Sequence, residues 1–225
     1  MKTKNFTTFL FLIALTLQLS VAQAATILYV PQDDRPVSLD NVVDTAEAAK
    51  LTVLTPPDEL IASRDKKGDP DKLWQWVDEH AGQANALVLS GDALIYGGLV
   101  DSRTHDFGEA VLKERLARFN ELRKAHPFVN VYVYSTVLRT PQGTAGGVEP
   151  AYYEQYGWNI FQLTALRDKE ELEGLTKKEK ELLKNNLAII PPEALNDWMQ
   201  RRQKNFAINS GLIDLDRQGV LDYFL

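Results

Sequence analysis

Two segments of the chain place reactive and hydrogen-bonding side chains directly after stretches with the composition of β-strands. The first segment, residues 30–37, contains Asp33, Asp34 and Arg35. The second segment, residues 90–103, combines an acid, a phenol, two adjacent glycines and an arginine. Because ligands of parallel α/β sheets bind beyond the carboxyl ends of the strands, we expect these segments to form opposite walls of one site.

The acids of these segments suggest general acid and base chemistry. Asp33, Asp34 and Asp92 are the predicted catalytic residues, with Asp92 paired with one of the other two. When carboxylates crowd together, one pKa rises while the other group stays ionised, so the two divide the acid and base roles. An alternative interpretation of the first segment is a turn held by an ion pair within Asp34-Arg35-Pro36, and the sequence leaves both open.

The remaining polar residues of the two segments, with one arginine after a later strand, are predicted to orient a substrate. Arginine forms forked hydrogen bonds to anionic or hydroxyl-rich ligands, and glycine lets a backbone pass close to one. The alternatives are an ordinary tight turn at the glycines and, for the later arginines, ion pairs with Asp33, Asp34 or Asp101. The predicted substrate-binding set is Arg35, Ser90, Tyr96, Gly97, Gly98, Arg103 and Arg139.

Aromatic residues in the stretch 152–161 would suit the flat face of a sugar, but their spacing also fits a buried helical stripe. The glycines at 143–147 would permit a mobile lid.

Several kinds of chemistry lack the residues that they need. The chain has no cysteine, which excludes thiol catalysis and thiolate metal sites. We find no phosphate-binding loop, dinucleotide-binding pattern or Gly-x-Ser-x-Gly elbow, and the three histidines lack the His-Glu-x-x-His spacing. We therefore predict no cofactor, with a Mg²⁺ or Ca²⁺ ion at Asp33, Asp34 and Asp92 as an alternative that the spacing does not demand.

Strand-like and helix-like stretches alternate along the first part of the chain, which predicts parallel strands joined by crossover helices. The predicted class is α/β, with a parallel sheet that is either doubly wound or an incomplete βα barrel, followed by a helical segment from about residue 150. The expected strands are 26–30, 52–54, 86–89, 129–137 and one beginning at Leu221.

The clearest expected helix is 109–124, and another is expected at 39–50. Further helices should begin after the cap residue Asp69 and after the capping box that opens at Thr176. A last helix should begin at Pro191-Pro192, with an apolar side formed by Leu195, Trp198, Met199 and Phe206.

The N-terminus has the features of a cleavable signal peptide over residues 1–24, with a basic start, a short apolar core and the small-residue site Ala22-Gln23-Ala24. We expect a secreted or periplasmic protein in which residues 25–225 form one α/β domain, the N-terminal part of a longer protein.

The formal net charge of −6 argues against nucleic acid as a partner. The expected partner is a small molecule or glycan, with no membrane contact after signal removal; the oligomeric state stays open.

Two long motifs give the chain a resemblance to a known family. The stretches Val30-Pro31-x-Asp33-Asp34-Arg35-Pro36-Val37 and Ser90-x-Asp92-x-Leu94-x-Tyr96-Gly97-Gly98-Leu99-x-x-Ser102-Arg103 resemble those of family 4127 of the bacterial domains of unknown function. The resemblance extends to Arg139 and to Glu149-Pro150-x-Tyr152. It implies no activity, but it does imply longer proteins with a further acidic motif after the strand that begins at Leu221.

Taken together, these features favour an exported hydrolase that acts on carbohydrate through carboxylates at strand ends. The alternative is a periplasmic or surface module that binds the same ligands without turning them over. A third interpretation is structural, in which the charged cluster only ties the strand ends together.

Overall fold

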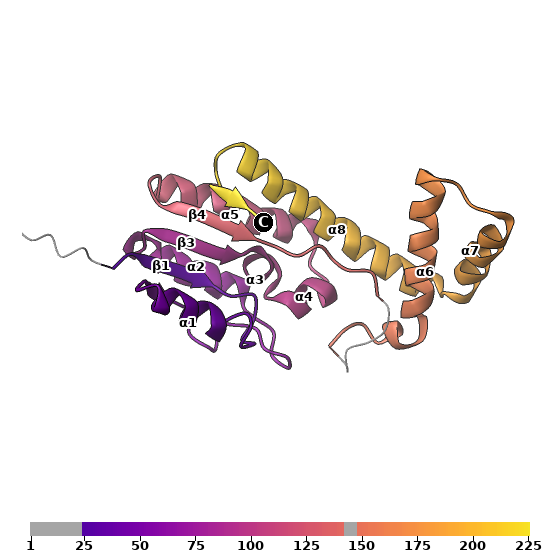
Figure 1. Cartoon of the computed structure of the whole chain (residues 1–225), viewed down its shortest axis with the longest axis horizontal. Helices are drawn as coiled ribbons and strands as arrows, with labels where there is room; N and C mark the ends of the chain where they lie inside the picture. The colour runs from indigo at the N-terminus through magenta and orange to yellow at the C-terminus, as the bar shows by residue number, and fades with distance from the viewer. Residues whose placement is uncertain (1–23, 142–147) are drawn as a thin grey trace, which may run out of the picture.

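The computed structural model describes residues 24–141 and 148–225, which fold around a parallel β-sheet (Figure 1). The strand order is β2-β1-β3-β4-β5, and every neighbouring pair runs parallel. The strands are β1 (Thr26–Val30), β2 (Thr52–Leu54), β3 (Ala86–Ser90), β4 (Asn130–Tyr134) and β5 (Tyr223–Phe224).

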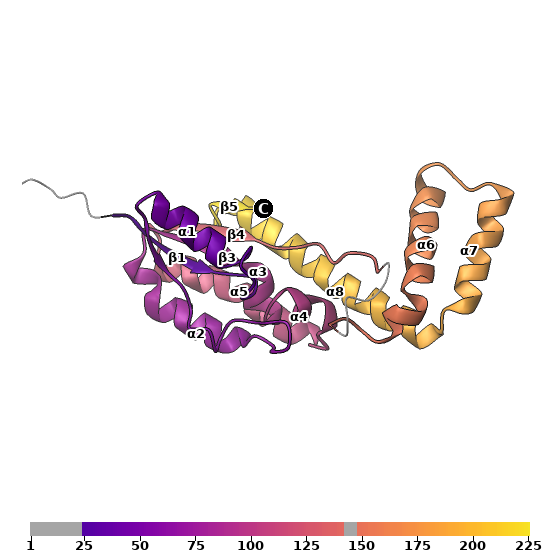
Figure 2. The ribbon, with the colours of Figure 1, turned by 60° about the horizontal axis from the view of Figure 1, so that its bottom comes forward.

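This order confirms the predicted α/β class and decides between its two forms. In the described sheet β1 lies between β2 and β3, whereas a βα barrel places its strands side by side in chain order, so the fold is doubly wound and not an incomplete barrel. Figure 2 shows α1 (Asp40–Ala48) and α2 (Pro70–His80) on opposite faces of the sheet. The chain changes its direction of winding between β1 and β3, which makes this the topological switch point where ligands bind in open α/β sheets.

The helices that follow cover the α2 face of the sheet or extend beyond it. Helices α2, α3, α5 and α8 contact one another in sequence across that face. Helices α6 and α7 project from the far end of α8 as an arm (Figure 1). Their bounds are α3 (Gly91–Tyr96), α4 (Leu99–Thr104), α5 (Glu109–Ala125), α6 (Tyr152–Leu172), α7 (Lys177–Ile189) and α8 (Pro192–Arg217).

Local sequence signals account for several helix starts. Asp69 accepts a hydrogen bond from the backbone of Lys72 ahead of Pro70, the first residue of α2. Thr176 and Glu179 form the reciprocal capping box that opens α7. Both arrangements satisfy backbone N–H groups that the first turn of a helix leaves without partners.

Two apolar cores hold the molecule together, and α8 belongs to both. The larger core packs strand residues such as Leu28 and Leu87 against Trp74 and Phe119 of the helices. The smaller core lies in the arm and includes Tyr153, Ile160 and Trp198. The aromatic stretch from Tyr152 therefore forms a partly buried helical stripe, while Trp158 is exposed and stacks on Phe161.

Two expectations lie wholly or mainly outside the described residues: the signal peptide at 1–24 and the glycines at 143–147. Among the residues that the structure describes, no helix is both long enough and apolar enough to cross a membrane.

Candidate functional site

Asp92 lies at the centre of the carboxyl edge of the sheet and joins three segments. Its Oδ2 accepts hydrogen bonds from Gln32 Nε2 at 2.5 Å, from Thr136 N at 3.0 Å and from Thr136 Oγ1 at 2.7 Å. Its Oδ1 accepts from Ser135 Oγ at 3.0 Å. Gln32 follows β1 and Ser135 follows β4, so the carboxylate ties the loops after β1 and β4 to the start of α3.

The surroundings of Asp92 are neutral donors in a buried site. The residue is 1% exposed, and burial raises the pKa of its carboxyl, while the hydrogen bonds from Thr136, Gln32 and Ser135 act in the opposite direction. A carboxyl whose pKa is raised by burial is suited to donate a proton. The same burial means that a substrate reaches this carboxyl only if Gln32, Ser135 or Thr136 moves.

Asp33 and Asp34 lie at the same edge, in the loop after the neighbouring strand β1, but they have different surroundings. Asp33 is buried and forms an ion pair with Arg35, with Oδ2 2.7 Å from Nη2 and 2.9 Å from Nε. Asp34 is exposed, and its backbone N–H donates to Ala62 O. The ion pair of this turn therefore involves Asp33, whereas the sequence suggested Asp34.

The two segments that the sequence singled out are in direct contact through glycines. Gly97 ends α3 with a φ of 114°, a left-handed conformation that favours glycine. A Cβ on Gly98 would lie 3.0 Å from the carbonyl oxygen of Gln32. A Cβ on Gly68 would lie 1.9 Å from the carbonyl oxygen of Gly97, so the loop before α2 also packs against this turn. Asp101, which is buried, accepts from Gly68 N at 3.2 Å.

Arg103 and Arg139 converge on one carboxylate that does not belong to the predicted site. Oε1 of Glu149 lies 3.3 Å from Arg103 Nη1 and 2.7 Å from Arg139 Nη2. The Glu149 side chain is 0% exposed, whereas those of Arg103 and Arg139 are 21% and 41% exposed. Both arginines are therefore paired with Glu149, and the alternative interpretation, an ion pair with Asp33, Asp34 or Asp101, names a partner other than the one observed.

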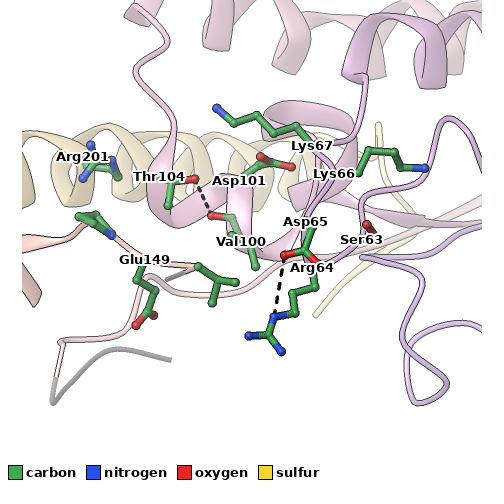
Figure 3. A pocket seen from close by; sticks show the side chains of 12 residues that line it. Ser63, Arg64, Asp65, Lys66, Lys67, Val100, Asp101, Thr104, Glu149 and Arg201 are labelled. Atoms are coloured by element: carbon green, nitrogen blue, oxygen red, sulfur yellow. Dashed lines mark hydrogen bonds and ion pairs between the residues drawn. The ribbon is translucent and has the colours of Figure 1, made fainter. Parts of the chain in front are cut away.

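A pocket of about 520 Å³ opens beside this ion-pair triad (Figure 3). One wall is the loop 63–67, the floor is α4 with Val100, Asp101 and Thr104, and the other wall carries Glu149 and Arg201. Arg201 is held by a forked ion pair to Asp197, with N···O distances of 2.7 and 2.8 Å. The pocket wall is therefore rich in charged groups of both signs.

Tyr96, the last residue of α3, and His105, which follows α4, form a buried stack with ring centroids 4.7 Å apart. The Tyr96 hydroxyl has no hydrogen-bond partner among the described residues, and burial raises its pKa. His105 Nε2 lies 2.8 Å from Asn205 Oδ1. Burial lowers the pKa of His105 to about 4; Arg201 and Lys204 act in the same direction, and Asn205 opposes them.

We expect His105 to make the fold sensitive to acid. The unfolded chain binds this proton near pH 6.5 and the folded chain only near pH 4, so stability is lost as the pH falls between these values. The loss should approach about 3 kcal/mol at pH 4, from 1.36 kcal/mol per pKa unit. Urea unfolding at intervals from pH 7 to 4 measures it, and His105→Gln should flatten the profile. An equal slope in both proteins would contradict this assignment.

The site contains predicted residues, such as Ser90, and residues that the sequence analysis did not select. Ser90 caps α3 by accepting from Ala93 N at 3.1 Å and is 0% exposed, so it has a structural contact at the centre of the edge. Sequence reasoning did not select Gln32, Glu149 or the loop 63–67. The run Arg64-Asp65-Lys66-Lys67 was visible as a charged segment, but only the fold brings it to face α4.

The described residues contain no group of three or more His, Cys, Asp and Glu side chains that is arranged to hold a metal ion. This applies to Asp33, Asp34 and Asp92: Asp33 pairs with Arg35, the Asp92 carboxylate accepts from Ser135 and Thr136, and Asp34 is exposed.

Comparison with known proteins identifies the family of this chain. The family model described as "Protein of unknown function (DUF4127)" matches residues 27–225. No curated protein and no solved structure matches the chain. Because the matched range covers β1 to β5 and both motif segments, the chain belongs to the DUF4127 family of proteins of unknown function.

Proposed function

We propose that the protein is an exported ligand-binding domain and that the pocket beside the carboxyl edge of its sheet takes a carbohydrate. The observation that carries this proposal is the burial and hydrogen bonding of Asp92, which is 1% exposed and accepts four hydrogen bonds. A carboxylate with these contacts fixes the loops at the carboxyl edge of the sheet in the positions that a ligand would meet. The neighbouring pocket of about 520 Å³ has room for a ligand.

Two further features support this proposal. The pocket lining is mostly polar and charged, which suits a ligand that carries many hydroxyl groups. The basic start, apolar core and small-residue cleavage site of residues 1–24 support export, which would bring the domain into contact with extracellular or periplasmic glycans.

Ligand binding is tested by thermal unfolding of the purified protein with glucose, galactose, N-acetylglucosamine, glucuronate and glucose 6-phosphate. A sugar present at 100 times its Kd should stabilise the fold by about 2.7 kcal/mol, which corresponds to a rise in Tm of roughly 5–10 °C. Isothermal titration then gives the stoichiometry, which we expect to be one. A panel in which no sugar changes Tm or releases heat would overturn the proposal.

Hydrolysis of carbohydrate is the second candidate, and the raised pKa of Asp92 favours it. In this mechanism Asp92 protonates the leaving group and Asp33 or Asp34 acts as base or nucleophile. Arg35, Tyr96, Arg103 and Arg139 would orient the substrate, together with Ser90 and the Gly97-Gly98 turn. Positioned acid catalysis contributes 10²–10⁴-fold, so Asp92→Asn should lower turnover by at least about 100-fold.

The two candidates are separated by assaying product release from oligosaccharides in the same samples that are used for binding. Binding with no product supports the binding domain. Product release that Asp92→Asn abolishes, while circular dichroism shows the variant folded, would establish hydrolysis instead.

A further inference from the structure

Asp101 is the buried acid with the fewest partners. Four acidic side chains are buried among the residues that the structure describes, and three of them are fully engaged. Asp33 and Glu149 form ion pairs with arginines, and Asp92 accepts four hydrogen bonds. Asp101 accepts a single hydrogen bond, from Gly68 N at 3.2 Å, and forms no ion pair within the described part of the chain.

The second oxygen of this carboxylate remains open to a ligand. Gly68 N donates to Oδ2, whereas Oδ1 accepts from no described residue. Unlike Oε2 of Glu149, Oδ1 is not among the fully enclosed side-chain atoms that lack a partner. Asp101 belongs to the floor of the pocket, where Figure 3 shows it between Thr104 of the same helix and Lys67 of the loop. Oδ1 is therefore an acceptor that a ligand in the pocket can reach.

The few partners of Asp101 leave its charge poorly compensated in the unliganded protein. The residue is 5% exposed, and burial raises the pKa of its carboxyl, although the bond from Gly68 and the charge of Lys67 act in the opposite direction. Proteins generally pair the charges that they bury, and an acid that departs from this rule inside a pocket is a candidate for ligand contact. A ligand that donates to Oδ1 supplies the missing hydrogen bond.

We infer that Asp101 is the residue through which the pocket recognises its sugar, with Oδ1 accepting a hydrogen bond from one hydroxyl of the ligand. This inference rests on the proposed function and names the chemical group that is recognised. A carboxylate or phosphate of the ligand would be repelled at this position. The positive charge of Lys67 already acts on Asp101, so the missing contact is a hydrogen bond and not a second cation. An uncharged hydroxyl is the donor that meets both conditions.

The test is isothermal titration of the wild type and of Asp101→Asn with glucose, galactose, N-acetylglucosamine, glucuronate and glucose 6-phosphate. In the variant, the amide oxygen can still accept from Gly68 N, while an NH₂ group replaces Oδ1 and donates where the ligand also donates. Each of these sugars that binds the wild type should bind the variant at least about tenfold more weakly, the loss expected for a hydrogen bond to a charged group.

Monodeoxy derivatives of the sugar that binds most tightly identify the hydroxyl. The derivative that lacks it should bind the wild type roughly tenfold more weakly than the parent sugar does. The same derivative should bind wild type and Asp101→Asn equally, because the substitution removes a contact that this ligand does not make. The other derivatives should lose affinity in the variant as the parent sugar does.

The stability of the unliganded variant separates recognition from a structural role. Because Asp101→Asn removes a poorly paired buried charge, its Tm should equal that of the wild type or exceed it, whereas loss of a structural residue lowers Tm. Asp44→Asn is the matched control, since it removes the same charge from an exposed position on α1 outside the pocket lining. The control should change neither Tm nor the affinity for any sugar.

The outcomes separate this inference from the proposed function. Sugar binding that Asp101→Asn does not weaken overturns the inference and leaves carbohydrate binding intact, as does a set of monodeoxy derivatives that all bind like the parent. A lowered Tm of unliganded Asp101→Asn assigns the residue a structural role instead. Glucosamine that binds about tenfold more tightly than glucose would show that a cation is the recognised group. If no sugar binds, the inference and the proposed function both fail.

Discussion

Asp92→Ala will destabilise the fold by about 3–5 kcal/mol, because it leaves several buried donors without their shared acceptor, at a cost of about 1–3 kcal/mol for each unsatisfied group. The substitution removes an acceptor shared by Gln32, Ser135 and Thr136 and leaves their donors in a site that is 1% exposed. The loops after β1 and β4 then lose their link to α3. We therefore expect a fall in Tm of roughly 10 °C or more.

Urea or thermal unfolding of the wild type and the variant measures this effect. Asp34→Ala is the matched control, because it removes an exposed aspartate from the same edge and should change stability by less than about 0.5 kcal/mol. If the two variants proved equally stable, Asp92 would not be the structural centre of the edge.

Gly68→Ala will destabilise the protein by about 3 kcal/mol and abolish ligand binding in the neighbouring pocket. The added Cβ would lie 1.9 Å from the carbonyl oxygen of Gly97, which is backbone and has no flexible end to move. Overpacking of this kind costs typically 1–3 kcal/mol, and the upper end applies where the backbone itself must shift. The shift separates the loop 63–67 from α4 and breaks the bond from Gly68 N to Asp101.

The glycine prediction is checked by unfolding and by titration with the sugar panel. Gly108→Ala is the control, because a Cβ at Gly108 would meet no atom within 4 Å and its φ of −70° suits alanine. That variant should be neutral or more stable by up to about 1 kcal/mol. Equal stability of Gly68→Ala and Gly108→Ala would show that the loop adapts to the added methyl group.

The sequence was a good guide where local chemistry sets local structure. Alternating apolar strands and amphipathic helices predicted the parallel α/β sheet, and the cap residues Asp69 and Thr176 marked the helix starts correctly. The sequence also predicted that Asp33 and Asp92 lie at one edge of the sheet, because the carboxyl ends of parallel strands lie on one side of a sheet. The sequence did not decide between a doubly wound sheet and a barrel, because that difference depends on which strands pair with one another.

Periodicity misled the prediction for the longest helix. Leu195, Trp198, Met199 and Phe206 were expected on its apolar side, yet Met199 is 41% and Phe206 is 72% exposed. The buried positions of α8 recur at alternating intervals of four and three residues and include two polar ones. They are Ala194, Trp198, Arg201, Asn205, Ile208, Leu212 and Leu215. The buried face therefore depends on partners for Arg201 and Asn205, which lie about 100 residues earlier in the chain.

In residues 91–104 the sequence pattern also failed to predict the helices that form. The sequence indicated a connection, but the segment forms the two short helices α3 and α4, joined by Gly97 and Gly98. Six residues are too few for a helical period to be recognised, and isolated helices of this length are not stable in water. Tertiary contacts stabilise them here, including the bond from Trp74 Nε1 to Leu94 O at 2.9 Å.

By itself, the sequence determined the fold class, the helix caps and the edge of the sheet on which the acids lie, because these depend on short-range pattern and on the geometry of parallel strands. Only the tertiary structure decided that Asp92 is enclosed by neutral donors and that Arg103 and Arg139 pair with Glu149. These contacts join residues 10–60 positions apart. A charged side chain can pair with any opposite charge that the fold brings near, so sequence spacing alone does not identify its partner.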